Sequence, residues 1–200
     1  VELLMDSAIE LQLVGDVRQA ILQTNIRDPK YQHYKGTDIK RWFDIHYANG
    51  DLLLEQRSTT WRCNALIAAF ADTIFAADWG FAPTLSLNDQ VTGHDGLFAV
   101  ATEHAQAYVT MFSPLCLRYN AAAGGALNLP FTNIRLAKGC EAERVLLVPT
   151  QAMKRFVSEG KMLKTSTASS LYVAVTRARA SVAFVVDEPR QLGLRIWTPY

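Results

Sequence analysis

Short apolar runs with strand character alternate with helical repeats along most of the chain. Strand-like runs are predicted at Glu10–Val14, Leu52–Leu54, Gly96–Val100, Leu115–Arg118, Thr132–Leu136, Arg144–Val148 and Ser181–Val186. Helical periodicity predicts Thr37–Tyr47, Thr59–Phe75 with Ser58 as its N-cap, Glu103–Phe112, Gln151–Glu159 and Ser169–Arg177. This alternation predicts an α/β fold with a mostly parallel sheet flanked by helices.

Two polar stretches interrupt the alternation, and we interpret both as loops. They are Asn25–Gly36, which could join two core domains, and Tyr119–Pro130, which contains an Ala-Ala-Ala-Gly-Gly run. The chain has 200 residues, half of them hydrophobic, which is enough for one domain or for one domain with part of another. Val1 lies inside a helical pattern, so we expect the sequence to begin within a longer protein.

Composition excludes several classes of protein. The 20 basic residues nearly balance the 19 acidic ones, so total charge does not indicate a polyanion-binding protein. Three widely spaced cysteines without a C-x-x-C pair are typical of free thiols in a reducing cytoplasm. The apolar runs are short and broken by charges, so we expect no membrane span and no signal peptide.

Polar residues follow or precede the apolar runs at two places in the first third of the chain. Gln19 ends a Gly-Asp-Val-Arg-Gln segment behind a predicted strand, so we expect it at the carboxyl end of the sheet, where an amide can sense a phosphate or a water. Arg57 precedes the predicted cap Ser58, where a helix N-terminus favours anions. When each segment is considered alone, an ordinary turn and an exposed arginine beside a Ser cap are the favoured explanations.

Two further charged segments lie in the last third. Lys138, Gly139 and Glu141 precede a strongly apolar strand, and glycine allows close approach of the backbone to a ligand. A surface turn with a solvated ion pair is the alternative. Arg177 and Arg179 end an apolar helix, where they complement the helix dipole or serve as arginine fingers toward a transferring phosphoryl group.

Taken together, the four segments resemble motifs III to VI of the UvrD/Rep-type superfamily 1 DNA helicases. They are VGDVRQ, EQRS, AKGCE and LYVAVTRAR, in that order, and the similarity extends from Val14 to Val186. The resemblance implies a RecA-like, P-loop NTPase-type fold, with residues 1–27 ending a first core domain and residues 28–200 forming the second. The segments GDVRQAILQTN, HDGLFAV and YVAVTRARASVAFVVD are similar to a compact UvrD-like branch that includes the Gabija helicase.

The resemblance also implies roles for individual residues. Gln19 would couple the ATP state to DNA, and Arg57 and Arg177 would contact the γ-phosphate. Glu141 would lie on the nucleotide side of the cleft, and Lys138-Gly139 would shape the same loop.

DNA and other partners follow from the same resemblance. Asn133 and Arg135 would contact single-stranded or partly duplex DNA. ATP and Mg²⁺ would be bound mainly by an N-terminal RecA-like domain of the same protein, and a nuclease or another defence-system component would be a further partner.

Departures from the family pattern limit these implications. No G-x-x-x-x-G-K-[ST] occurs in the sequence, so we expect these 200 residues alone not to hydrolyse ATP. Ala20-Ile21-Leu22-Gln23 stands where the family has a base-stacking aromatic residue, and too few residues separate Ser58 from Ala137 for a large inserted subdomain. A non-catalytic helicase-fold module that binds DNA or a protein, and a nucleotide-binding protein without DNA, are the alternatives.

Overall fold

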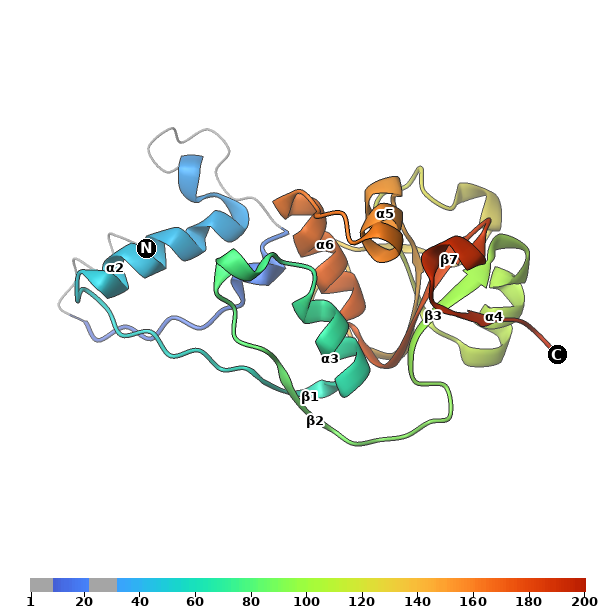
Figure 1. Cartoon of the computed structure of the whole chain (residues 1–200), viewed down its shortest axis with the longest axis horizontal. Helices are drawn as coiled ribbons and strands as arrows, with labels where there is room; N and C mark the ends of the chain where they lie inside the picture. Colours follow the sequence, from blue (N-terminus) through green and yellow to red (C-terminus); the bar gives the residue numbers. More distant parts are fainter. Residues whose placement is uncertain (1–8, 22–31) are drawn as a thin grey trace.

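The computed structural model describes residues 9–21 and 32–200, which form two parallel sheets with helices around them (Figure 1). The larger sheet has six strands in the order β5-β4-β6-β7-β3-β8, and every pair of neighbours is parallel. Its strands are β3 (Gly96–Ala101), β4 (Leu115–Arg118), β5 (Thr132–Asn133), β6 (Ala142–Val148), β7 (Ala178–Val186) and β8 (Arg195–Trp197). The smaller sheet pairs β1 (Thr59–Asn64) with β2 (Leu85–Asn88).

Helices cover both faces of the larger sheet. Its central strands send alternate side chains into two separate apolar clusters, because successive residues of a strand point to opposite faces. One cluster contains Leu147 and Phe184 together with side chains of α3 (Ala65–Asp72), α5 (Gln151–Glu159) and α6 (Thr165–Val175). The other contains Leu146 and Ala183 with side chains of α4 (Ala105–Phe112). The predicted α/β fold with a mostly parallel sheet between helices is therefore confirmed.

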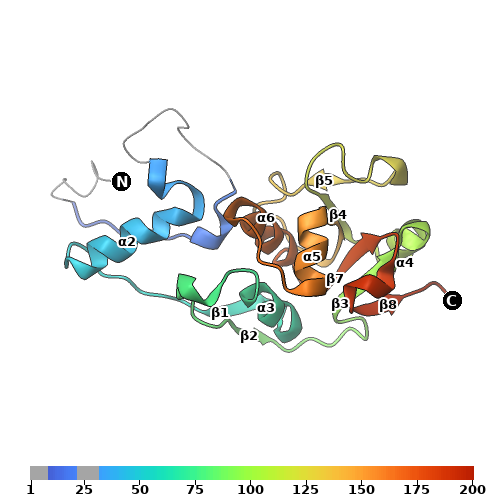
Figure 2. The ribbon, with the colours of Figure 1, turned by 45° about the horizontal axis from the view of Figure 1, so that its top comes forward.

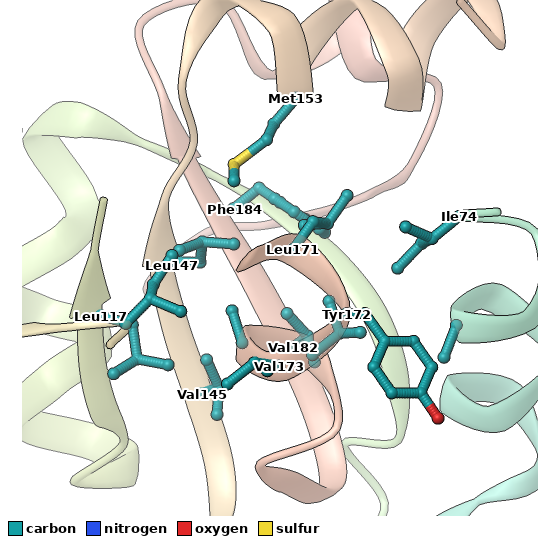
Figure 3. Packing of buried hydrophobic residues seen from close by; sticks show 14 of the residues in the cluster. Ile74, Leu117, Val145, Leu147, Met153, Leu171, Tyr172, Val173, Val182 and Phe184 are labelled. Carbon is teal, nitrogen blue, oxygen red and sulfur yellow. The ribbon is translucent and has the colours of Figure 1, made fainter. Parts of the chain in front are cut away.

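Helix α6 lies at the centre of the larger cluster. Eight consecutive residues of this helix, 168–175, are buried, so it is enclosed on all sides rather than amphipathic. Figures 1 and 2 show it beside α5 and close to α3. Figure 3 shows Leu171 and Val173 among strand side chains, whereas Tyr172 lies at the margin with its hydroxyl pointing away from them. The segment immediately after α6 is thus held by a rigid helix.

The smaller sheet is attached to the start of β7 through Asn64. Its Oδ1 accepts a hydrogen bond from Ile67 N at 3.1 Å and caps α3, while its Nδ2 donates to Ala180 O at 2.7 Å. Asn88 of β2 donates to Arg62 O at 2.7 Å. These bonds fix the smaller sheet against the amino-terminal end of β7.

The remaining elements are one α-helix and several short 3₁₀-helices. α2 (Ile39–Ala48) lies at the end of the molecule away from the larger sheet (Figure 1). The 3₁₀-helices span Val17–Gln19, Gln32–Tyr34, Gly36–Asp38, Ala77–Trp79, Thr102–His104, Gly125–Leu127 and Pro189–Leu192. The predicted loop Tyr119–Pro130 is irregular apart from one of these turns, whereas residues 25–31 of the other predicted loop, and the predicted boundary at residue 27, lie outside the described residues.

Several predicted elements agree closely with the structure. β4 and α5 have the predicted bounds, and α2, α4, β3, β6 and β7 differ from them by three residues or fewer at each end. α6 begins at Thr165, four residues before the predicted start, and ends at Val175, so that Arg177 follows the helix instead of ending it.

The prediction of one helix over Thr59–Phe75 is wrong. The β-branched and aromatic residues at its start form β1, since they pair with β2, and the helix begins only after Asn64. Asn64 therefore replaces Ser58 as the N-cap. β2 and β8 were not predicted, because both are short strands whose pairing is non-local.

Three predicted strands are absent or shortened. Glu10–Val14 and Leu52–Leu54 have no ladder partner among the described residues and are irregular, because an extended segment needs a neighbouring strand to satisfy its backbone groups. Thr132–Leu136 keeps only its first two residues as β5, and the chain then turns. Among the described residues, none of the helices is long and apolar enough to span a bilayer.

Replacing Asn64 by alanine should destabilise the fold by about 2 kcal/mol, since the α3 cap is lost and the buried carbonyl of Ala180 loses its donor. Urea unfolding followed by circular dichroism measures the change. Asn49→Ala, at an exposed position after α2, is the matched control and should leave the free energy of unfolding within about 0.5 kcal/mol. Equal effects of both variants would contradict the assigned cap.

Candidate functional site

The predicted site residues of the last third meet at the amino-terminal edge of the larger sheet. Glu141 and Arg177 directly precede Ala142 and Ala178, the paired first residues of β6 and β7. Ala142 N also donates to Arg177 O at 2.9 Å, which aligns the two segments. Gln19 contacts Arg177 at this edge. The predicted strand before Gln19 pairs with no other strand among the described residues, so its place at the carboxyl end of a sheet stays a prediction.

Arg177 is a buried cation whose hydrogen-bond acceptors are all neutral. Only 2% of the residue is exposed. Nε donates to Val173 O at 3.1 Å, Nη1 to Cys140 O at 3.1 Å, and Nη2 to Gln19 Oε1 and Thr176 Oγ1 at 3.3 Å each. Among the described residues no carboxylate forms an ion pair with it. Burial, and next the charge of Arg62, lower the pKa of the guanidinium.

Gln19 is oriented by a small turn that Asp16 organises. Asp16 Oδ1 accepts from Arg18 N at 3.0 Å and caps the 3₁₀-helix Val17–Gln19, while its Oδ2 accepts from Gln19 Nε2 at 3.0 Å. Because the amide nitrogen is held by Asp16, the amide oxygen faces Arg177. The predicted sensing residue is thus in contact with the predicted arginine finger.

The loop before β6 contacts both of these residues. Lys138 Nζ donates to the backbone oxygen of Gln19 at 3.0 Å, and Cys140 O accepts from Arg177. Gly139 between them has φ +94°, a conformation that other residues rarely adopt. The glycine therefore allows Lys138 and Cys140 to reach Gln19 and Arg177 at once.

Glu141 lies between two arginines on a polar cavity of about 610 Å³. Its Oε2 accepts from Arg62 Nε at 3.2 Å, and its Oε1 accepts from Arg179 Nη2. Hydrogen bonds from Arg179 and then from Arg62 lower the pKa of Glu141, so the carboxylate is ionised at neutral pH. The cavity is walled in addition by β1, the end of β2 and the residues after it.

Arg57 does not join this network. Its side chain is 81% exposed, and Nε donates to Glu55 at 2.9 Å, which raises the pKa of Arg57. It lines a second cavity of about 340 Å³, which Gln19 and Arg62 also line. The residue that joins the network from this part of the chain is Arg62, which also donates to Thr176 O at 3.5 Å. Sequence reasoning missed Arg62, although it lies two residues before Asn64, the true cap.

Trp61 is an exposed aromatic residue at the edge of the polar cavity. It lies on β1, 73% exposed, and lines the same cavity as Arg62 and Arg179. Its indole therefore presents a flat apolar surface beside two guanidinium groups.

The two predicted DNA-contacting residues lie apart from Arg177, at the outer edge of the larger sheet. Asn133 ends β5, and its Oδ1 accepts from Arg118 Nε at 3.3 Å. Arg135 is exposed in the following turn. Within residues 9–21 and 32–200 no group of three or more His, Cys, Asp or Glu side chains is arranged to hold a metal ion.

The class defined by these features is an α/β protein with an arginine-rich site at the starts of adjacent parallel strands. No protein-family model and no curated protein matches the sequence. One similar solved structure is the C-terminal domain of a possible DNA helicase from Lactobacillus plantarum WCFS1, with TM-score 0.42, 12% identity and coverage of 64% of this chain and 87% of that one.

A second similar structure is the PRRSV helicase, with TM-score 0.42 and 21% identity over 74% of this chain. The present chain spans only 26% of that helicase. Both TM-scores are below 0.5, so neither structure assigns a function to this chain.

Thiol reactivity should follow burial at this site. Burial raises the pKa of the Cys63 and Cys116 thiols to about 11 each, whereas Cys140 is exposed in the loop before β6. Because the thiolate is the reactive form, we expect iodoacetamide at pH 8 to modify Cys140 first and the other two only after unfolding. Peptide mass spectrometry measures this order. Rapid labelling that persists in a Cys140→Ser variant would contradict it.

Proposed function

We propose that this chain is the C-terminal motor portion of an ATP-dependent DNA helicase or translocase. In this role it supplies arginines to the phosphates of an ATP that another RecA-like domain of the full-length protein holds. The observation that carries the proposal is the buried guanidinium of Arg177, which has only neutral acceptors among the described residues.

A buried charge without a counter-ion is costly, so its presence needs a compensating role. Arg177 is surrounded by oxygen dipoles that hold the guanidinium plane in one orientation. A planar guanidinium held in this way suits a phosphate, which it can bind in bidentate fashion. Gln19 contacts the same guanidinium at Nη2, which gives Gln19 its proposed role of linking phosphate occupancy to movement.

Arg62 and Arg179 form the second part of the proposed phosphate site. Their shared partner Glu141 is 43% exposed at its side chain, and such surface ion pairs contribute little free energy. A nucleotide phosphate can therefore displace Glu141 from Arg62 and Arg179 at little cost in free energy. The exposed indole of Trp61 on the same cavity suits stacking on a nucleobase.

The N-terminal segment supports the proposal of a second domain. Residues 9–14 belong to no helix or strand and carry apolar side chains at alternate positions from Ile9 to Leu13, and Leu13 and Val14 are 50% and 91% exposed. Alternating apolar residues of this kind are typical of a strand that completes a sheet, and the proposed first core domain would provide that sheet. We propose further that Asn133 and Arg135 contact single-stranded DNA, and that the other domain binds Mg²⁺, which neutralises phosphate charge when bound.

Arg177 should be essential for turnover. In the full-length protein, Arg177→Ala should lower the kcat of DNA-stimulated ATP hydrolysis by about a thousandfold, because charge on the transferring phosphoryl group is no longer neutralised. Arg177→Lys should remain strongly impaired, since lysine keeps the charge but not the planar fork. Release of phosphate measures kcat, and thermal unfolding verifies that each variant is folded. A folded Arg177→Ala variant with normal kcat would disprove the assignment.

Arg62 and Arg57 should differ sharply in importance. Arg62→Ala should lower kcat/KM for ATP by at least about tenfold, since the arginine lies in the network of Glu141 and Thr176. Arg57→Ala should change it by less than about twofold, as for most surface substitutions. The two variants are matched controls for each other in the same ATPase assay. The reverse order would return the phosphate-contacting role to Arg57.

A further inference from the structure

We propose that Arg18 is a positioning residue that holds Gln19 against Arg177 by fastening the turn Asp16–Gln19 to helices α3 and α6. This inference rests on the proposed function. Its starting point is that Arg18 is only 16% exposed at its side chain although it lies on a short 3₁₀-helix.

Arg18 bridges two carboxylates from distant parts of the chain. Its Nε donates to Asp16 Oδ1 at 3.1 Å within its own turn, and its Nη1 lies 3.5 Å from Asp72 Oδ1. Asp72 is the last residue of α3, and Thr84 N and Oγ1 hold it at 2.6 and 2.7 Å. One guanidinium thus joins the turn to the helix that follows Arg62.

Aromatic rings fix the same guanidinium. Its central carbon lies 4.6 Å from the ring centre of Tyr172 and 5.3 Å from that of Phe81, both within the range of cation–π attraction. Tyr172 belongs to α6, five residues before Arg177, and lies at the edge of the apolar core (Figure 3). Burial, and next the charge of Asp16, raise the pKa of the Tyr172 phenol, so the ring stays neutral at physiological pH.

Arg18 is connected to Arg177 through two residues, Asp16 and Gln19. Asp16 uses Oδ1 for Arg18 and Oδ2 for the Gln19 amide nitrogen, so the position of its carboxylate determines where the Gln19 amide lies. The Gln19 amide oxygen then meets Arg177. Without Arg18, the carboxylate loses its ion pair and the turn loses its attachment to α3 and α6. Gln19 would then sample other orientations, and turnover would fall even though every phosphate-contacting arginine remains.

A double-mutant cycle on the full-length protein tests this coupling. The variants are Arg18→Gln, Gln19→Ala and the double variant, and the readouts are kcat and KM for ATP with saturating single-stranded DNA. We expect each single substitution to lower kcat by about tenfold with little change in KM, and the double variant to be no worse than Gln19→Ala, since the two residues act through one contact. Arg41→Gln, which removes a 70% exposed arginine that pairs with Asp38, is the matched control and should match wild type.

Multiplicative losses of kcat in the double variant, or a normal kcat for Arg18→Gln, would overturn the positioning role. A wild type without DNA-stimulated ATPase would disprove the proposed function itself. Amide hydrogen exchange distinguishes the two outcomes because it needs no activity. Arg18→Gln should raise exchange of the peptide covering residues 15–21 by about tenfold while the β7 peptide is unchanged, and equal exchange in Arg18→Gln and Arg41→Gln would overturn the inference independently.

Discussion

The guanidinium of Arg177 is the interaction on which the arrangement of the site depends. Its N–H groups donate hydrogen bonds to three segments at once: the end of α6, the loop before β6 and the turn that carries Gln19. A guanidinium is planar and has five donors in fixed directions, so these segments can satisfy it in few relative positions. Moving any one of them leaves a buried donor unpaired, which costs about 1–3 kcal/mol. The hydrogen bonds of Arg177 therefore hold the three segments in the arrangement that the structure shows.

Local sequence signals were sufficient to predict those elements whose ends are marked by residues of the sequence itself. α5 begins after Thr150, whose hydroxyl accepts from Met153 N, and ends at Gly160 with φ +69°, so both bounds followed from the sequence. Residues 59–64 were misassigned for the opposite reason. Their helical periodicity continues that of α3, and only pairing with β2, more than twenty residues later, makes them a strand. Non-local pairing of this kind leaves no local pattern.

The residues of the candidate site also divide into those that local patterns predicted and those that depend on contacts between distant parts of the chain. Lys138, Glu141 and Arg177 were found because each precedes or follows an apolar element that a single sequence reveals, and the structure places all three at one edge. Arg62 was missed because the sequence predicted Ser58, not Asn64, as the residue that caps the helix. Which cap is used depends on the Asn64 bond to Ala180, more than a hundred residues away. The omission of Arg62 is thus a consequence of the error at the helix start, whereas the role of Arg57 stays a prediction.

The arginines at this edge of the sheet have two kinds of partner: a carboxylate for Arg62 and Arg179, and neutral groups for Arg177. Arg62 and Arg179 share one exposed carboxylate, so their charge is balanced at the surface and an incoming anion must compete with Glu141. Arg177 is held by neutral dipoles, so its positive charge is oriented but not cancelled. Electrostatic stabilisation is strongest where water is excluded, so the buried arginine offers the larger gain for charge that develops during phosphoryl transfer. Gln19 contacts that arginine, so the proposed chemistry would depend on the turn of residues 16–19, which holds Gln19 in place.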